Sequence, residues 1–146
     1  MDLRVALVPH GKITMVVPSL MQYLVKSEAW TRGRATVDDI VGFLYSGRMQ
    51  LWLVYDSADL KGYGYVISEI KEYPRCKMLV IQYCAGEPNH MQYVEDVMHH
   101  VLESFAKDAG CAGIEYFGRP GWKQHVKKYG YDIQTVVYEK IFGDTP

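Results

Sequence analysis

Hydrophobic positions repeat at two different spacings along the chain, and the change of spacing separates predicted strands from predicted helices. From residue 50 to residue 83, β-branched and aromatic side chains predominate, which is typical of strands. The sequences Asp56-Ser-Ala-Asp59 and Tyr73-Pro74 interrupt this region in the manner of turns. The pattern therefore predicts an antiparallel meander of three strands, over residues 50–56, 61–71 and 75–83.

The clearest predicted helix follows this meander. Its apolar residues recur every three or four positions and would line one face, at Val94, Val97, Met98, Val101, Leu102, Phe105 and Ala109. Gly110 comes directly afterwards, as expected of a residue that ends a helix. A strand over residues 111–117 is predicted next. Because a strand–helix–strand unit crosses over right-handedly, the strands on either side of this helix are expected to be parallel.

Two helices are predicted between a first strand and the meander. Residues 3–8 form a short apolar run that favours a strand. Pro18 favours the start of a helix that continues to about Lys26. A second helix is expected to begin at Thr36, whose hydroxyl can cap it, and to stop at Gly47.

The C-terminal part of the chain adds a short helix and a last strand. The helix is expected over residues 120–129, with Gly130 ending it, and the strand over residues 132–142. The predicted order is then β-α-α-β-β-β-α-β-α-β, in one domain that spans residues 1–146. This order implies an α/β (α+β) fold with a mixed, mostly antiparallel central sheet and helices on both faces.

Composition narrows the class of protein. The 146 residues are 49% hydrophobic and 23% charged, with a net charge of −1, as is ordinary for a globular domain. No apolar run is long enough for a membrane span and no signal-peptide pattern is present, so we expect a cytoplasmic protein. The near-neutral charge, without a basic stripe, argues against nucleic-acid binding. Three cysteines without C-x-x-C spacing, and no clustered ligand set, predict no metal site.

The element order and several short motifs resemble the GCN5-related N-acetyltransferase superfamily. Lys61-Gly-Tyr-Gly-Tyr-Val66 resembles the glycine-containing third strand of that family, and Ala106-Lys-Asp-Ala-Gly110 resembles the A-x-x-x-G that ends its long helix. Tyr129-Gly130-Tyr131 resembles the G-F after its last helix. More loosely, Gly118-Arg-Pro-Gly-Trp122 followed by Tyr-Gly-Tyr resembles acetyltransferase-like proteins of tailed bacteriophages. The resemblance covers nearly the whole chain. A cleft between the fourth and fifth strands, with free backbone N–H groups near residues 90–94, would distinguish an active protein of this kind from a degenerate one.

In this family, a Q/R-x-x-G-x-G/A segment that opens the long helix binds the pyrophosphate of coenzyme A, and the resemblance places it at residues 90–95. Tyr93 and Glu95 occupy the two glycine positions. A tyrosine side chain would crowd the phosphates and a carboxylate would repel them. The resemblance thus implies that no cofactor is expected or, if the protein is active, that acetyl-CoA or coenzyme A binds through a shifted loop. The residues that would bind it are Cys84, Gly86, His90, Met91, Gln92 and Tyr93.

The catalytic residues that the resemblance implies are also altered. The family's tyrosine acid, four residues before the glycine of G-F, corresponds to Val126 here. If the protein is active, Tyr129 is the candidate acid. A general base takes a proton from the amine through water, and Glu115, Glu87 or Glu69 are carboxylates that can do so.

Two functions follow from these residues. In the first, the chain is an acetyltransferase-fold protein with degenerate acyl-CoA-binding and catalytic motifs, which acts through contacts with another protein or with itself. A phage-encoded protein of this kind would be found in the virion or the host cytoplasm. In the second, it is an active acyl-CoA-dependent N-acetyltransferase with a non-standard pyrophosphate loop. The twelve tyrosines and three tryptophans suit an interaction surface, and core packing accounts for them equally well.

Overall fold

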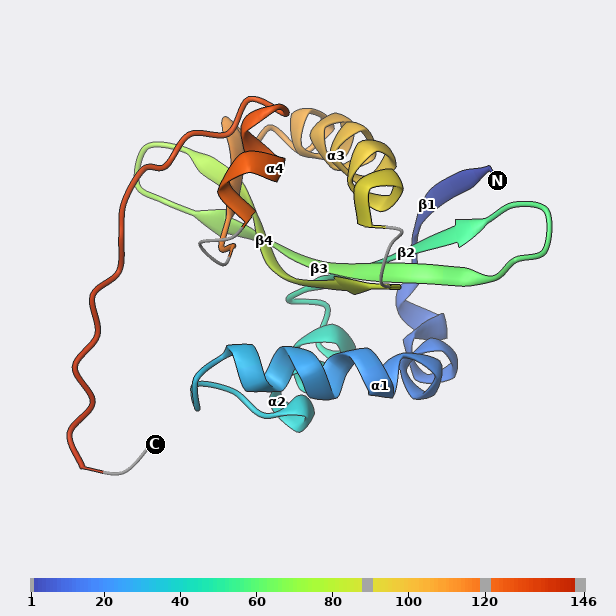
Figure 1. The fold of residues 1–146 in the computed structure, drawn as a ribbon, viewed down its shortest axis with the longest axis horizontal. Helices are drawn as coiled ribbons and strands as arrows, with labels where there is room; N and C mark the ends of the chain where they lie inside the picture. The colour runs from blue at the N-terminus through green and yellow to red at the C-terminus, as the bar shows by residue number, and fades with distance from the viewer. Residues whose placement is uncertain (1, 88–90, 119–121, 144–146) are drawn as a thin grey trace.

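The computed structural model describes residues 2–87, 91–118 and 122–143, together with all their side chains except those of residues 91–94 and 125. A five-stranded sheet with the order β1-β2-β3-β4-β5 lies at the centre, and helices cover both of its faces (Figure 1). Its strands are β1 (Leu3–Leu7), β2 (Gln50–Asp56), β3 (Gly62–Glu72), β4 (Lys77–Gly86) and β5 (Gly113–Tyr116).

The pairing within this sheet is mixed. Strands β1 to β4 are antiparallel neighbours, whereas β4 and β5 run parallel. The parallel pair is the one expected from a right-handed crossover through the long helix. The predicted mixed, mostly antiparallel α/β sheet is therefore confirmed.

Helices α1 (Ile13–Trp30) and α2 (Val37–Tyr45) pack on one face of the sheet (Figure 1). The start of α2 is as predicted, because the Thr36 side chain accepts a hydrogen bond from the Asp39 backbone N–H. The Asp39 carboxylate accepts one from the Thr36 N–H in return, which completes a capping box.

The start of α1 differs from the prediction. The helix begins at Ile13, directly after a short 3-10 helix η1 (His10–Lys12), so Pro18 lies inside it and not at its first turn. Ile13 and Val17 are both buried in the core. Burial of this first turn outweighs the backbone hydrogen bond that Pro18 cannot donate.

Helix α3 (Met91–Asp108) covers the opposite face of the sheet, and the short helix α4 (Lys123–Lys127) lies beside it (Figure 1). The inner side of α3 packs on the sheet through Met98, Leu102 and Ala106. Gly110, with a φ of 80°, ends this segment as predicted. The expected start of α4 at residue 120 lies outside the described residues. None of the described helices is both long and apolar enough to cross a membrane.

The predicted last strand is wrong. Residues 131–143 contain no strand or helix and run away from the sheet as a drawn-out trace (Figure 1). The β-branched and aromatic side chains of residues 132–142 are typical of a strand, but a strand also needs a neighbour for its backbone hydrogen bonds. No described segment of the same chain is that neighbour.

Candidate functional site

Strands β4 and β5 part from each other at one end, and the candidate site lies where they do. Their parallel pairing runs from Met78 opposite Gly113 to Ile81 opposite Tyr116. Beyond this point β4 continues to Gly86, and no strand among the described residues pairs with this edge of it. The edge therefore presents peptide N–H and C=O groups to the gap.

A β-bulge lies in β4 where the gap opens. Ile67 of β3 is opposite Tyr83, whereas the next residue, Ser68, is opposite Ile81. Gln82 is thus an extra residue with no partner in the β3 register. Such a bulge bends its strand and increases the local twist, which is a physical reason for β4 to diverge from β5 here.

A pocket occupies the gap between the two strands. Its walls come from the end of α1, from β4 around the bulge, and from the chain at and after the end of β5. The lining residues are Ser27, Trp30, Gln82, Tyr83, Cys84, Tyr116, Phe117, Gly118 and Trp122. Tyr83 packs with the core under α1, whereas Cys84 and Tyr116 pack with the core under α3. The pocket therefore combines groups from both faces of the sheet.

Tyr116 contributes a hydroxyl to the residues that line this pocket. Its oxygen is 2.9 Å from the Cys84 sulfur on the facing strand. The ring of Trp122 packs beside the ring of Tyr116, and the two ring centroids are 6.0 Å apart. Burial, and next the nearby Cys84, raise the pKa of Tyr116 above its ordinary value. The pocket thus contains a neutral hydroxyl that can donate a hydrogen bond. Sequence reasoning missed Tyr116, and its place at the end of a strand was the only available signal.

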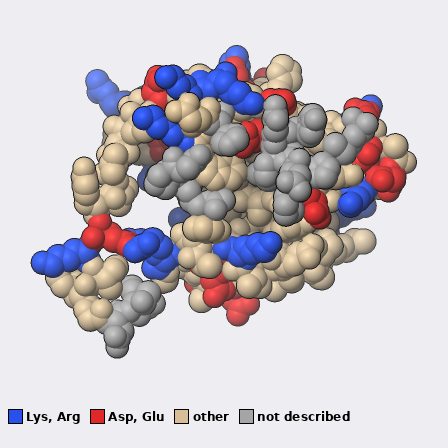
Figure 2. All heavy atoms as spheres, viewed as in Figure 1, with Lys and Arg blue, Asp and Glu red and all other residues tan. Residues whose placement is uncertain are grey.

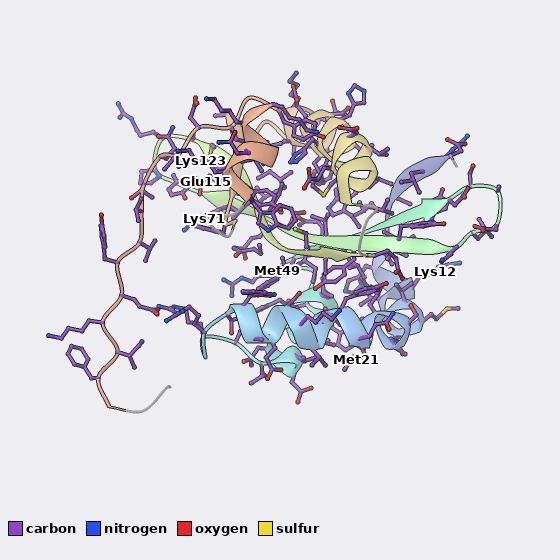
Figure 3. All side chains as sticks on the ribbon, in the orientation of Figure 1. Lys12, Met21, Met49, Lys71, Glu115 and Lys123 are labelled. Atoms are coloured by element: carbon purple, nitrogen blue, oxygen red, sulfur yellow. The ribbon has the colours of Figure 1, made fainter. Side chains whose placement is uncertain are left out.

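Two of the predicted bases lie outside the set of pocket-lining residues. Glu87 accepts a hydrogen bond of 2.8 Å from the Tyr23 hydroxyl, and Glu115 accepts one of 3.0 Å from the Tyr73 hydroxyl. Figure 3 shows Glu115 at the β5 end of the sheet, on the same side of the molecule as Lys71. Both carboxylates are therefore engaged by phenols rather than by the pocket residues.

Glu69, unlike the other two carboxylates, accepts a side-chain hydrogen bond from a pocket-lining residue. Its Oε1 accepts a hydrogen bond of 3.3 Å from Gln82 Nε2, and Gln82 lines the pocket. Its Oε2 accepts one of 2.8 Å from Arg48 Nε. Only 12% of the Glu69 side chain is exposed, so this ion pair is partly shielded from solvent. The structure thus connects a carboxylate to the bulge through one amide side chain.

Tyr129, the candidate acid, contacts α3. Its hydroxyl donates a hydrogen bond to Asp96, and its ring stacks on His99 with centroids 4.3 Å apart. Burial and the Asp96 carboxylate raise the pKa of Tyr129. Tyr129 is not among the pocket-lining residues.

The arrangement of strands and helices was compared with known proteins. No protein-family model matches the sequence, and no curated protein matches it. Among solved structures, a predicted acetyltransferase with acetyl-CoA from Clostridium acetobutylicum superposes with a TM-score of 0.69 at 13% identity, covering 95% of this chain and 96% of that one. Glucosamine-6-phosphate N-acetyltransferase from Arabidopsis thaliana gives 0.65 at 13% identity, covering 98% and 100%. Ribosomal-protein-alanine N-acetyltransferase from Brucella melitensis gives 0.67 at 12% identity, covering 94% and 99%.

The chain has the acetyltransferase fold. At identities this low, the likeness establishes the fold alone. The pocket described above lies between the fourth and fifth strands, where a cleft would favour an active protein over a degenerate one.

The residues expected to bind coenzyme A in this acetyltransferase fold are only partly described. Cys84 lines the pocket, and Gly86 is the last residue of β4. His90 lies outside the described residues, as do the side chains of residues 91–93 at the start of α3. Glu95 is buried under α3, with 2% of the residue exposed. Within the described chain, no three His, Cys, Asp or Glu side chains converge on a possible metal site.

Proposed function

We propose that the chain binds the thioester end of an acyl-CoA in the β4–β5 pocket and transfers the acyl group to an amine. The observation that carries this proposal is the divergence of β4 from β5, where a strand edge, a bulge and a pocket coincide. In open sheets, ligands commonly bind in the crevice beyond the carboxyl ends of parallel strands. This pocket lies beyond the carboxyl end of the parallel pairing between β4 and β5. A protein of the same fold, from Clostridium acetobutylicum, was solved with acetyl-CoA.

The described pocket residues suit the pantetheine arm of such a ligand. Pantetheine carries two amides, and peptide groups on the β4 edge can pair with them in the way a sheet edge binds an extended peptide. Cys84 and the rings of Tyr116 and Trp122 supply largely apolar walls. The pocket-lining residues that the structure describes are uncharged, which suits a neutral segment such as pantetheine.

Two side chains have roles in the proposed transfer. As the amine attacks the thioester carbonyl, the Glu69 carboxylate, next to Gln82, accepts a proton from the amine through water. The Tyr116 hydroxyl donates a hydrogen bond to the sulfur as the carbon–sulfur bond breaks. Because the pKa of Tyr116 is raised, it keeps its own proton. The thiolate then leaves and takes up, through water, the proton that Glu69 accepted, which returns Glu69 to its carboxylate form.

Replacing Tyr116 by phenylalanine tests this assignment. The substitution removes the hydroxyl and keeps the ring, so thiol release from acetyl-CoA in the presence of a panel of primary amines should fall by about 100-fold. The dissociation constant of acetyl-CoA should change by only a few-fold, because the pocket wall remains. Tyr129→Phe is the matched control and should stay within about twofold of the wild type, since Tyr129 bonds to Asp96 and not to a pocket residue.

The same pair of variants can contradict the proposal. If Tyr129→Phe abolishes thiol release and Tyr116→Phe does not, Tyr129 is the acid. If the wild-type chain binds acetyl-CoA but no amine of the panel leads to thiol release, the pocket binds the ligand without transferring its acyl group.

The start of α3 favours a second candidate function. Tyr93 and Glu95 stand where the family places glycines, and the carboxylate of Glu95 lies buried under the helix. We propose, as the alternative to transfer, that the fold is retained for binding another protein, as a virion or assembly component in a phage. This alternative requires that neither acetyl-CoA nor coenzyme A binds, which a calorimetric titration measures directly.

A further inference from the structure

The C-terminal arm, residues 131–143, carries a dense set of exposed apolar side chains. These are Ile133, Val136, Val137, Tyr138, Ile141 and Phe142. Val137 is 76% exposed, Tyr138 91% and Phe142 86%. A contiguous apolar segment in water is unfavourable, and such a surface marks a site of interaction.

The arm is held to its own chain near its two ends. At its start, the Tyr131 hydroxyl lies 3.1 Å from His99 Nδ1. Further along, Glu139 accepts a hydrogen bond of 2.8 Å from Arg34 and pairs with Arg32. Between these points the arm runs clear of the sheet (Figure 1), and in the space-filling view it stands off from the body of the molecule (Figure 2). These contacts leave most of its apolar side chains facing solvent.

The edge of the sheet at β5 lacks a strand partner of its own. β5 is the last strand in the sheet order, and no described residue pairs with its outer side. An open edge presents a row of peptide N–H and C=O groups to which another strand can add. One chain thus carries both a segment with a strand-like sequence and an edge that needs a strand.

We propose that two copies of the chain exchange their arms, each arm adding a strand to the β5 edge of the other copy. A second copy is the partner that fits, because it supplies a donor arm and an acceptor edge at the same time. The two-fold arrangement that results closes on itself and leaves neither β5 edge open.

The area available is enough for a stable dimer. An aromatic side chain buries about 150–250 Å² when it is covered, and two arms carry four such rings, from Tyr138 and Phe142 of each copy. Eight aliphatic side chains add to this. The total reaches the roughly 1,200 Å² at which specific interfaces begin.

An exchanged arm would also lie next to the candidate pocket. Phe117 and Gly118 follow β5 directly, and both line the pocket. A strand added to the outer edge of β5 would therefore stand beside the pocket wall. The inference does not depend on acyl transfer, since it rests on the arm and the edge alone.

Sedimentation velocity of the full chain, combined with hydrogen exchange, tests the exchange. The wild type should sediment as a dimer, with slow amide exchange at residues 113–116 and 132–142. The double variant Val137→Asp, Tyr138→Asp should be a monomer with fast exchange at both segments, because two carboxylates cannot be buried against the partner. Its far-ultraviolet circular dichroism should keep the helical signal of the wild type, since neither side chain belongs to the core.

The matched control is Gln134→Asp, Thr135→Asp, which adds the same charges at two polar, exposed positions of the arm. This variant should remain a dimer. A monomeric wild type would overturn the proposal, and slow exchange at residues 113–116 in that monomer would mean that the arm pairs with its own edge. A dimer that survives Val137→Asp, Tyr138→Asp would also overturn it. A monomeric variant in which the amides of residues 113–116 still exchange slowly would overturn it as well, because the arm would then contact a different surface.

Discussion

His99 shows how burial sets the chemistry of a single residue in this molecule. It is only 5% exposed, and the rings of Tyr129 and Tyr131 lie with centroids 4.3 and 5.2 Å from its own. Burial lowers the pKa of His99 to about 4, although the Asp96 and Glu103 carboxylates act in the opposite direction. The folded chain therefore keeps the imidazole neutral at a pH where the unfolded chain would protonate it.

The free energy of unfolding should consequently decrease as the pH is lowered from about 6.5 to about 4. In that window the unfolded state binds a proton at His99 and the folded state does not, and the difference amounts to about 3 kcal/mol. Urea denaturation at a series of pH values measures this decrease. His99→Gln should remove most of it, whereas His100→Gln, at the exposed neighbouring position, should leave it unchanged. An equal acid sensitivity in His99→Gln and the wild type would show that the imidazole is not responsible.

Some residues could be assigned from the sequence and others could not, for a physical reason. Thr36 and Gly110 act through their own backbone and the next few residues, so local rules predicted both. The contacts and the pKa values of Tyr116 and His99 depend on the residues that surround them after folding. Their neighbours come from distant parts of the chain, such as Cys84 for one and Tyr131 for the other. No sequence spacing carries that information.

At the scale of elements, β3 and β4 approach each other closely at the glycines of the third strand. A Cβ added to Gly64 would lie 2.8 Å from the Ala85 carbonyl oxygen, which is backbone and cannot rotate away. A Cβ added to Gly62 would meet nothing within 4 Å. Gly64 is therefore the glycine of this strand that packing requires.

Gly64→Ala should destabilise the fold by about 1–3 kcal/mol, because the two strands must move apart to accommodate the methyl group. Because Gly64 lies opposite Gly86, at the end of β4, the substitution should also weaken acetyl-CoA binding. Thermal unfolding and ligand titration measure the two effects, with Gly62→Ala as the control that should change neither by much. Equal melting temperatures for the two variants would be inconsistent with this close approach.

The elements themselves were predicted well where one helix or strand determines its own pattern. The meander, the capped second helix and the long amphipathic helix all have the expected type. The first helix was placed too late, because the preference of proline for a first turn competes with the burial of Ile13 and Val17. The prediction of the last strand was wrong because a strand forms only when a partner strand is available. The sequence of residues 132–142 has a strand-like pattern but does not show which strand would pair with it.

In the whole molecule, a central sheet with helices on both faces opens at one point, between β4 and β5. Helices cover both faces of the sheet (Figure 1). The bulge at Gln82 bends β4 away from β5, and the pocket lies where the two strands part. The sequence predicted the layers and the parallel pair. It did not reveal that Tyr116 lines the pocket, because its contact Cys84 lies beyond the bulge, and the direction of a β4 side chain there depends on that bulge.

Calorimetric titration of the full chain with acetyl-CoA and with free coenzyme A measures whether the β4–β5 pocket binds an acyl-CoA. We expect saturable heat with one ligand per chain and a dissociation constant in the micromolar range for acetyl-CoA. Trp122 lines the pocket, so its fluorescence should change over the same concentrations. Absence of heat and of a fluorescence change at millimolar ligand would contradict the claim and leave an acetyltransferase fold that serves to bind another protein.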